Sequence, residues 1–346
     1  MSFVTWGFLM QTWTKASVND AVDEFLWSQW GQLGMAGVVQ RTDRWAIDPE
    51  ALLRFTLLFA PRDARLFDET LDWLCVNGRL VSAKRLRNLA RDPRERRLME
   101  ASLAWAGSYA PRLQLWARRR SEATTTEQLA DLYIQDPDPR FAAWGFVWPN
   151  TEPSGKSIRV DPSHPITLAF RLRLLIGVGA RAEIIRYLLT TDGRTSSTSE
   201  IAHASGFGRR NVADALSELA EARAVEVGSK SRGQQYSLEV QRWEGLLDFG
   251  RAGVPLYVDW IRLLESVWKI VRWFDEDAAL DRTEYIRASD ARRLVSTIED
   301  DLIATGVKVP PGREAHGVRY TDLFQELVSA VMKMLQASSS ERESPA

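Results

Sequence analysis

One central stretch, residues 181–238, constrains the fold of this chain more than any other part of the sequence. It begins with apolar residues at helical spacing, passes through a polar break and a short amphipathic segment, and turns through glycines into a longer amphipathic segment. Two strand-like runs joined by a glycine-containing loop follow, so the order is three helices and a hairpin. The predicted segments are a helix at 181–189, a break at 190–197, a short helix opened by Thr198 or Ser199, a turn at 206–208, a helix at 209–222, and strands at 224–227 and 235–238.

The residues around the turn determine how the two later helices face the core. Gly206 lies where the chain leaves the short helix, and we expect it to adopt φ > 0. In the next helix, apolar residues recur three and four positions apart, which predicts a buried side made of Val212, Ala215, Leu216 and Leu219. The polar residues at the start of this helix are then expected to point outward: Arg209, Arg210, Asn211 and Asp214.

The run SEIAHASGFGRRNVADALSEL at 199–219 resembles the second and third helices of MarR- and ArsR-like bacterial regulators. In that family the second of these helices lies in the major groove of DNA, and the hairpin, called the wing, contacts the flanking backbone or the minor groove. The resemblance covers residues 181–238 of the 346. It implies a winged helix-turn-helix that binds double-stranded DNA; the flanking regions resemble no regulator family.

The chemistry of the exposed residues is compatible with that implication. Arg209 or Arg210 can bind guanine O6 and N7 in a bidentate manner, and Asn211 can pair with an adenine edge. The free amides at the helix N-terminus attract phosphate, and basic residues at the wing tip suit phosphate or minor-groove contacts. The predicted DNA-binding residues are Ser199, Gly208, Arg209, Arg210, Asn211, Asp214, Lys230, Arg232 and Gln234.

The charge distribution allows DNA binding only through a local patch. The whole chain has a formal net charge of −1, and residues 181–240 contain eight basic and eight acidic side chains. A global basic field that would hold nucleic acid is therefore excluded. Within 181–240 the basic residues gather at the turn and the wing, whereas the acidic residues gather towards the end of the 209–222 helix.

A second basic region lies outside the central stretch. Residues 84–120 contain eleven Lys or Arg against three acidic residues. This excess indicates either a surface that contacts phosphates and releases counterions from a duplex, or a solvated face paired with acidic neighbours, including those of another subunit. The candidate phosphate contacts are Lys84, Arg85, Arg87, Arg118, Arg119 and Arg120.

The rest of the chain predicts a mainly α protein in which the central winged helix-turn-helix is flanked by N- and C-terminal helical regions. At 346 residues and 45% hydrophobic content, the chain can bury two or three cores. Most of the 14 tryptophans are expected to be core side chains between helices. The predicted domains are an N-terminal helical domain at 1–120, a short helix and a Pro- and aromatic-rich connector at 121–165, the winged domain at 166–240, a C-terminal helical region at 241–336 and a disordered tail at 337–346.

Capping residues and periodicity predict the individual flanking helices. The segment 65–90 is either part of a plain helical bundle or a second, degenerate helix-turn-helix. The apolar stripe of the helix at 255–275 is either a dimer seam or buried within the chain. The predicted helices are 18–33 after Ser17, one from Asp48-Pro49, 65–76, 83–90 after Ser82, one from Thr125 or Thr126 through 133, 165–177, 255–275, 290–304 and 321–335, with a turn at 310–312 between the last two.

The sequence offers few residues for catalysis or metal binding. Cys75 is the single cysteine, so no intrachain disulfide can form. The histidines His164, His203 and His316 lie in separate segments without a second ligand at metal spacing. The run 154–157 imitates the end of a phosphate-binding loop, but Asn150 stands where that loop needs glycine. We therefore expect no enzyme activity, no cofactor and no metal.

The leading hypothesis is a bacterial, cytoplasmic, DNA-binding transcriptional regulator that acts as a homodimer on a pseudo-palindromic site. A run of about eighteen apolar residues without a charge, as a membrane span needs, does not occur, so no membrane partner is expected. An alternative is an antitoxin or defence-operon component whose winged domain autoregulates and whose helical flanks bind a protein from the same operon. A third hypothesis, an enzyme with a novel site in the 139–165 connector, has no residues that support it.

Overall fold

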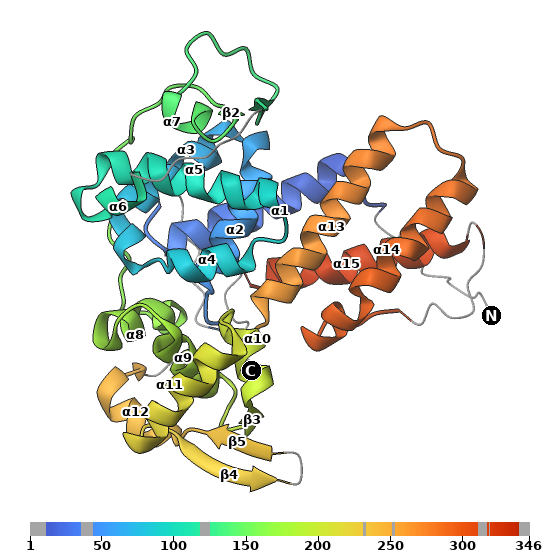
Figure 1. Ribbon diagram of the computed structural model, residues 1–346. Helices are drawn as coiled ribbons and strands as arrows, with labels where there is room; N and C mark the ends of the chain where they lie inside the picture. The colour runs from blue at the N-terminus through green and yellow to red at the C-terminus, as the bar shows by residue number, and fades with distance from the viewer. Residues whose placement is uncertain are drawn as a thin grey trace, which may run out of the picture. The chain divides into compact units, whose positions relative to one another are not determined.

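The computed structural model describes residues 12–35, 44–117, 125–230, 233–250, 253–310, 317 and 319–338. Within these residues the chain is mainly helical, with a two-stranded and a three-stranded sheet (Figure 1). The Cα positions form two compact units. One contains the described residues up to Phe25 together with Arg262–Ser339, and the other contains Leu26–Ile261. None of the described helices combines the length and the apolar character needed to cross a membrane.

The first half of the larger unit is a bundle of capped helices. The predicted caps are confirmed at Asp48, whose carboxylate accepts from Ala51 N at 3.1 Å, and at Ser82, whose hydroxyl accepts from Arg85 N at 3.2 Å. Helix α5 follows α4 where a second helix-turn-helix would need a hairpin, so the plain-bundle interpretation of 65–90 holds. The elements are the end of α1 (Lys15–Gln32) from Leu26 on, α2 (Pro49–Phe59), α3 (Ala64–Asn77), α4 (Ala83–Leu89), α5 (Pro93–Tyr109) and α6 (Gln114–Ala117), with 3-10 turns at Ala60–Arg62, Gly78–Leu80 and Pro111–Leu113.

Tryptophans form much of the core of this bundle, as predicted. Trp30, Trp73, Trp105 and Trp148 are completely buried. Each indole N–H has an acceptor: Trp30 donates to Thr56 Oγ1 at 2.9 Å, Trp73 to Leu33 O at 2.8 Å, Trp105 to Asp138 Oδ2 at 3.0 Å and Trp148 to Asp68 Oδ1 at 2.9 Å. Because the polar edge of each ring is satisfied inside the protein, these side chains serve packing and are not part of a ligand cage.

The connector differs from its prediction at one point. The helix expected from Thr125 or Thr126 through 133 is wrong: the chain there forms a two-residue strand, β1 (Glu127–Gln128), parallel to β2 (Phe146–Val147). Backbone bonds across this pair, such as Glu127 N to Gly145 O at 2.9 Å, replace the local helical bonds. Tertiary pairing therefore overrides local propensity here. The helix of the connector is α7 (Pro139–Ala142), opened by Asp138.

Cys75 and the run 154–157 both lie on α3 or against it. The thiol of Cys75 is half-buried, with its Sγ 3.9 Å from Ala106 O. The backbone N–H groups of Gly155 and Ser157 donate to the two carboxylate oxygens of Asp72 at 2.8 and 2.9 Å. The amides that would hold a phosphate are thus occupied by the chain's own carboxylate, which explains the residue pattern of this loop without a nucleotide.

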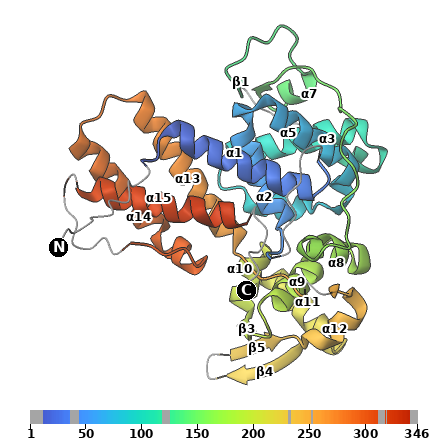
Figure 2. The ribbon, with the colours of Figure 1, turned by 180° about the vertical axis from the view of Figure 1, so that it is seen from behind.

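The second half of the larger unit contains the central stretch. Its elements are α8 (Leu168–Ile176) after a 3-10 turn at Pro165–Thr167, α9 (Ala180–Thr190), β3 (Ser196–Ser197), α10 (Thr198–Ser205), α11 (Arg209–Glu221), β4 (Glu226–Lys230), β5 (Gly233–Ser237) and α12 (Val240–Leu247). The strands form an antiparallel sheet in the order β3-β5-β4, and Val227 pairs with Tyr236. Figure 2 shows the β4-β5 hairpin projecting beyond the helices α9, α10 and α11.

The smaller unit contains most of α13 (Trp260–Ala279), together with α14 (Glu284–Ala304) and α15 (Arg319–Ala337). Helix α13 begins at Trp260, five residues later than predicted, and α14 begins at Glu284, six residues earlier. The side chains of Val267, Val271 and Phe274 are buried within the chain, as one of the two interpretations of the α13 stripe expected. The turn predicted at 310–312 and the tail predicted at 337–346 fall mostly outside the described residues.

Candidate nucleic-acid interface

The short helix α10 is opened by a capping box. Ser197 N donates to Glu200 Oε2 at 2.7 Å, and Glu200 N donates to Ser197 Oγ at 3.3 Å, which satisfies two amides of the first turn. The N-cap is therefore Ser197, and the prediction of Thr198 or Ser199 was wrong by one or two residues. Ser199 is exposed in the first turn. The helix ends at Gly206 with φ +68°, as predicted.

The orientation predicted for α11 is confirmed. Its inward side chains, Val212, Ala215, Leu216 and Leu219, are buried, and they pack in one cluster with residues of α9, α10 and β5 such as Ile185, Ile201 and Tyr236. Gly208, Arg209, Arg210, Asn211 and Asp214 are exposed. One side of α11 therefore closes the apolar core and the other side faces solvent. This explains why apolar and charged residues alternate at helical spacing in its sequence.

Arg209 and Arg210 stand at the open end of α11. Among the described residues, neither arginine makes a hydrogen bond or an ion pair. Gly208 provides no side-chain cap, so the first amides of this helix are not bound by a cap side chain either. Two fixed positive charges and the positive end of a helix therefore point to solvent at the same place, and this combination attracts an anion.

The outward face of α11 changes sign along the helix. Helical spacing puts Asp214, Ser217 and Glu221 on the same side as Arg210 and opposite the buried residues. Only the first turn of this face is basic, because the two carboxylates follow within three turns. A polyanion can therefore approach the N-terminal end of α11 but not its full length.

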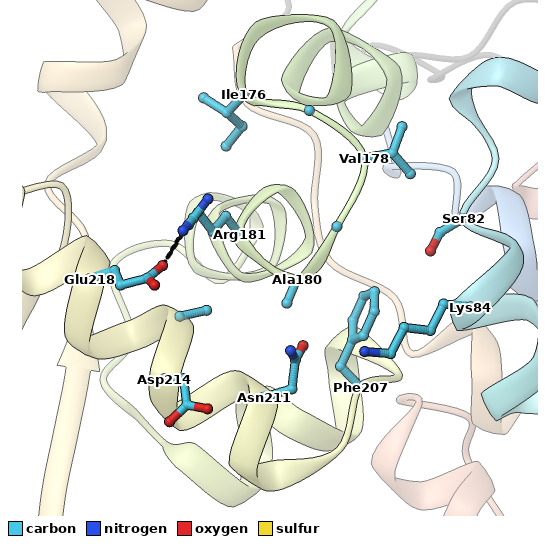
Figure 3. Close-up of a pocket in the computed structure, with 13 residues that line it drawn as sticks. Ser82, Lys84, Ile176, Val178, Ala180, Arg181, Phe207, Asn211, Asp214 and Glu218 are labelled. Atoms are coloured by element: carbon cyan, nitrogen blue, oxygen red, sulfur yellow. Dashed lines mark hydrogen bonds and ion pairs between the residues drawn. The ribbon is translucent and has the colours of Figure 1, made fainter.

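Asn211 lies on the flank of α11 beside a cavity of about 410 Å³. The cavity is bounded by the linker between α8 and α9, by Phe207 and by Lys84 of α4, and the Arg181–Glu218 ion pair lies at its edge (Figure 3). In Figure 3 the ammonium group of Lys84 points towards Phe207 and Asn211. Asn211 and Lys84, which are distant in sequence, are thus brought to one surface.

The predicted wing is described only in part. Strands β4 and β5 pair from Glu226 opposite Ser237 to Lys230 opposite Gly233, so the hairpin extends to the predicted tip. The backbone of Lys230 belongs to β4, whereas Arg232 lies outside the described residues. Gln234 is exposed, and its Oε1 accepts a hydrogen bond from the Tyr236 hydroxyl at 2.8 Å.

In the described part of the 84–120 region, several arginines are compensated and do not form a free basic surface. Arg85 is completely buried and ion-paired, so its prediction as a phosphate contact was wrong: its charge is neutralised in the interior. Arg87 donates to Glu100 Oε2 at 3.2 Å, and its charge is also compensated. Lys84 is exposed. Arg118, Arg119 and Arg120 lie outside the described residues.

The partners of Arg85 belong to a buried cluster of six charged side chains that sequence reasoning missed. Three arginines, Arg85, Arg173 and Arg186, alternate with three carboxylates, Asp48, Glu50 and Glu183, and all six are at most 3% exposed. Representative distances are Arg85 Nη1 to Glu50 Oε2 at 2.8 Å, Arg173 Nη2 to Glu50 Oε2 at 2.6 Å, Arg173 Nε to Glu183 Oε1 at 3.0 Å, and Arg186 Nη2 to Asp48 Oδ2 at 3.1 Å.

This charge cluster joins α2 and α4 of the bundle to α8 and α9 of the central stretch. Burial alone raises the pKa of Glu183, but the guanidinium groups of Arg173 and Arg186 outweigh it and lower the pKa to about 2. Asp48 behaves alike: burial opposes ionisation, yet Arg85 and Arg186 hold the pKa of this carboxyl well below its usual range. Asp48 and Glu183 are therefore ionised at neutral pH, and each charge of the cluster lies against an opposite charge. The i, i+3 pair Glu183 and Arg186, both at most 1% exposed, was the one local sign of this cluster in the sequence.

The histidine in the short helix has a structural partner. His203 Nε2 lies 3.2 Å from Asp259 Oδ2. Among the described residues, no three His, Cys, Asp or Glu side chains are grouped so that they could hold a metal ion.

The comparisons with known proteins add no relative. No protein-family model matches the chain, and neither the search of curated proteins nor that of solved structures found a significant match.

Proposed function

We propose that this protein is a sequence-specific DNA-binding regulator whose central stretch is a winged helix-turn-helix. The observation that carries the proposal is the exposed, unpaired state of Arg209 and Arg210 at the uncapped start of α11. Helix α11 acts as the recognition helix and the β4-β5 hairpin as the wing. The MarR- and ArsR-like pattern of residues 199–219 supports the same assignment.

The recognition helix enters the major groove by its first turn. There Arg209 or Arg210 reads guanine through O6 and N7, and the free amides at Gly208 receive a backbone phosphate. The carboxylates of Asp214 and Glu221 keep the later turns away from the phosphates, so the helix approaches end-on. Each bidentate arginine contact contributes about 1–3 kcal/mol of discrimination against the wrong base. The protein binds as a homodimer on a pseudo-palindromic site, as the two-fold symmetry of such sites requires.

The test compares the wild type with an Arg209→Ala, Arg210→Ala double variant. The wild-type protein is first used to select a short duplex from a random-sequence library. The double variant is expected to bind this duplex no more tightly than a scrambled one of equal composition, measured by fluorescence anisotropy. Its melting temperature should match the wild type, because both side chains are exposed and unpaired.

The matched control is Arg242→Ala. This arginine is also exposed, but it lies on α12 and forms a surface ion pair with Glu239. The Arg242→Ala substitution should leave the preference for the selected duplex unchanged. Wild-type levels of selectivity in the double variant would overturn the assignment of α11, and failure of the wild type to enrich any duplex would overturn the proposed function.

A further inference from the structure

Helix α4 belongs to the N-terminal bundle, yet it contacts the turn between α10 and α11 directly. Arg85 Nε donates to the carbonyl of Ser205, the last residue of α10, at 2.6 Å. One helical turn later, Asn88 Nδ2 donates to Gly206 O at 3.2 Å. The last carbonyl groups of a helix receive no hydrogen bond from an amide of that helix. Side chains of α4 donate to two such carbonyl groups at the C-terminal end of α10.

The contact is close as well as polar. A Cβ placed on Gly206 would lie 3.0 Å from Arg85 Nε and 3.3 Å from Leu89 Cδ2. Arg85 itself cannot shift, because its guanidinium is held by Asp48 and Glu50 in the buried charge cluster. The position of α4 relative to the start of α11 is therefore set by the interior of the larger unit and does not depend on a surface side chain.

Lys84 is the neighbour of this fixed arginine and points the other way, to solvent. Among the described residues it makes no hydrogen bond or ion pair. It shares the rim of the 410 Å³ cavity with Asn211 and Phe207, and Figure 3 shows its ammonium group directed to that side of α11. Two carboxylates lie on the same rim: Glu218 is paired with Arg181, and within the described residues no ion pair joins Asp214 to Lys84. An uncompensated cation therefore flanks the basic first turn of α11.

From this geometry we infer that the nucleic-acid-binding surface extends beyond the winged element onto α4, where Lys84 contacts a backbone phosphate of the duplex that α11 reads. The inference rests on the proposed function. Duplex DNA is the partner because the surface combines three unpaired cations, Lys84, Arg209 and Arg210, on two rigidly joined helices, and phosphates flank a groove on both sides of an inserted helix. Lys84 supplies charge at a fixed position and does not read a base.

The experiment measures how the affinity for the selected duplex depends on salt concentration. A protein that loses one phosphate contact shows a log K against log salt slope that is shallower by about one. We expect this for Lys84→Gln, together with an equal fold-loss of affinity for the selected and the scrambled duplex. Lys84→Arg keeps the charge and should restore the wild-type slope.

Lys156→Gln is the matched control, since Lys156 is an exposed lysine of the same unit whose loop is bound to Asp72 of α3. It should not change the slope. A wild-type slope in Lys84→Gln, or a change in the ratio of the two affinities, overturns the inference about α4. If Arg209→Ala, Arg210→Ala abolishes selectivity while Lys84→Gln has no effect, the proposed function stands and this inference fails; if the wild type binds neither duplex, both fail.

Discussion

The larger unit uses the same side chain in two opposite ways. Arg85, Arg173 and Arg186 are at most 2% exposed, and each binds two carboxylates of the charge cluster. Arg209 and Arg210 are exposed and have no partner among the described residues. The first three fix the central stretch to the bundle, whereas the other two remain available. The difference shows that an arginine is informative about binding only when its acidic partners are known.

The two groups also differ in what their removal costs. A buried charge that loses its partner retains the desolvation penalty, so breaking the pair is expensive. An exposed arginine without a partner leaves nothing unsatisfied when it is removed. Substitutions of the buried arginines or their partners are therefore expected to lower stability strongly without removing a proposed DNA contact. Substitutions of Arg209 and Arg210 are expected to remove a proposed DNA contact with little effect on stability.

The largest effect is expected from Glu50→Ala. This carboxylate binds both Arg85 and Arg173 and accepts from Ser82 N at 2.7 Å, so its removal leaves buried donors unsatisfied. The free energy of unfolding should fall by about 3–5 kcal/mol, measured by urea denaturation followed by tryptophan fluorescence. The control Glu218→Ala breaks the exposed pair with Arg181 and should cost no more than about 1 kcal/mol. If the free energy of unfolding fell equally in the two variants, burial of the charge cluster would not increase the cost of breaking its ion pairs.

A somewhat smaller effect is expected from acid. The pKa of Glu183 is lowered from 4.5 to about 2 in the folded protein. A group whose folded pKa is depressed stabilises the protein above the unfolded pKa, and this contribution is lost as pH falls through the folded one. Stability should therefore decline between about pH 5 and pH 2, by on the order of 3 kcal/mol for this group. Glu183→Gln should be less stable at neutral pH and show a shallower decline; an unchanged pH profile contradicts the assignment.

The smallest effect concerns the turn before α11, where Gly206 lies against the buried Arg85. Gly206→Ala places a Cβ at φ +68° and against Arg85 Nε, which should cost about 1–2 kcal/mol in thermal or urea unfolding. Gly228→Ala is the control, because nothing lies within 4 Å of a Cβ at that strand position. If both substitutions are neutral, α4 does not constrain the turn.

Local patterns predicted the elements of the central stretch well. The spacing of Val212, Ala215, Leu216 and Leu219 gave the buried side of α11, and a glycine at 206 gave the left-handed turn, because both depend on residues near in sequence. The helix predicted after Thr125 was wrong, because the backbone of this segment pairs with the strand β2 at residue 146. The caps at Asp48 and Ser82 were predicted correctly. The cap predicted at Ser17 was wrong, because α1 begins at Lys15, and the cap of α10 was wrong by one or two residues within the 197–199 run of hydroxyl residues.

The candidate site was predicted only where exposure follows from helical periodicity. Counting charges over 84–120 could not reveal that the partners of Arg85 stand at Asp48 and Glu50, more than thirty positions earlier, or that Arg94 pairs with Glu127. Those pairings are decided by tertiary packing, in which burial forces each charge to find a counter-charge. Charge counting also could not separate Lys84 from Arg85 and Arg87. Of these three residues, only Lys84 is both exposed and unpaired among the described residues.

The environment of Cys75 has a practical consequence for following the protein in solution. Burial, assisted by the nearby Asp72, raises the pKa of this thiol to about 12. Because the thiolate is the nucleophile, only about one molecule in a hundred thousand presents a reactive sulfur at pH 7. As this is the single cysteine of the sequence, a Ser217→Cys substitution on the outer side of α11 would give a selective attachment point for a fluorophore, and the native thiol would stay silent in the same labelling reaction.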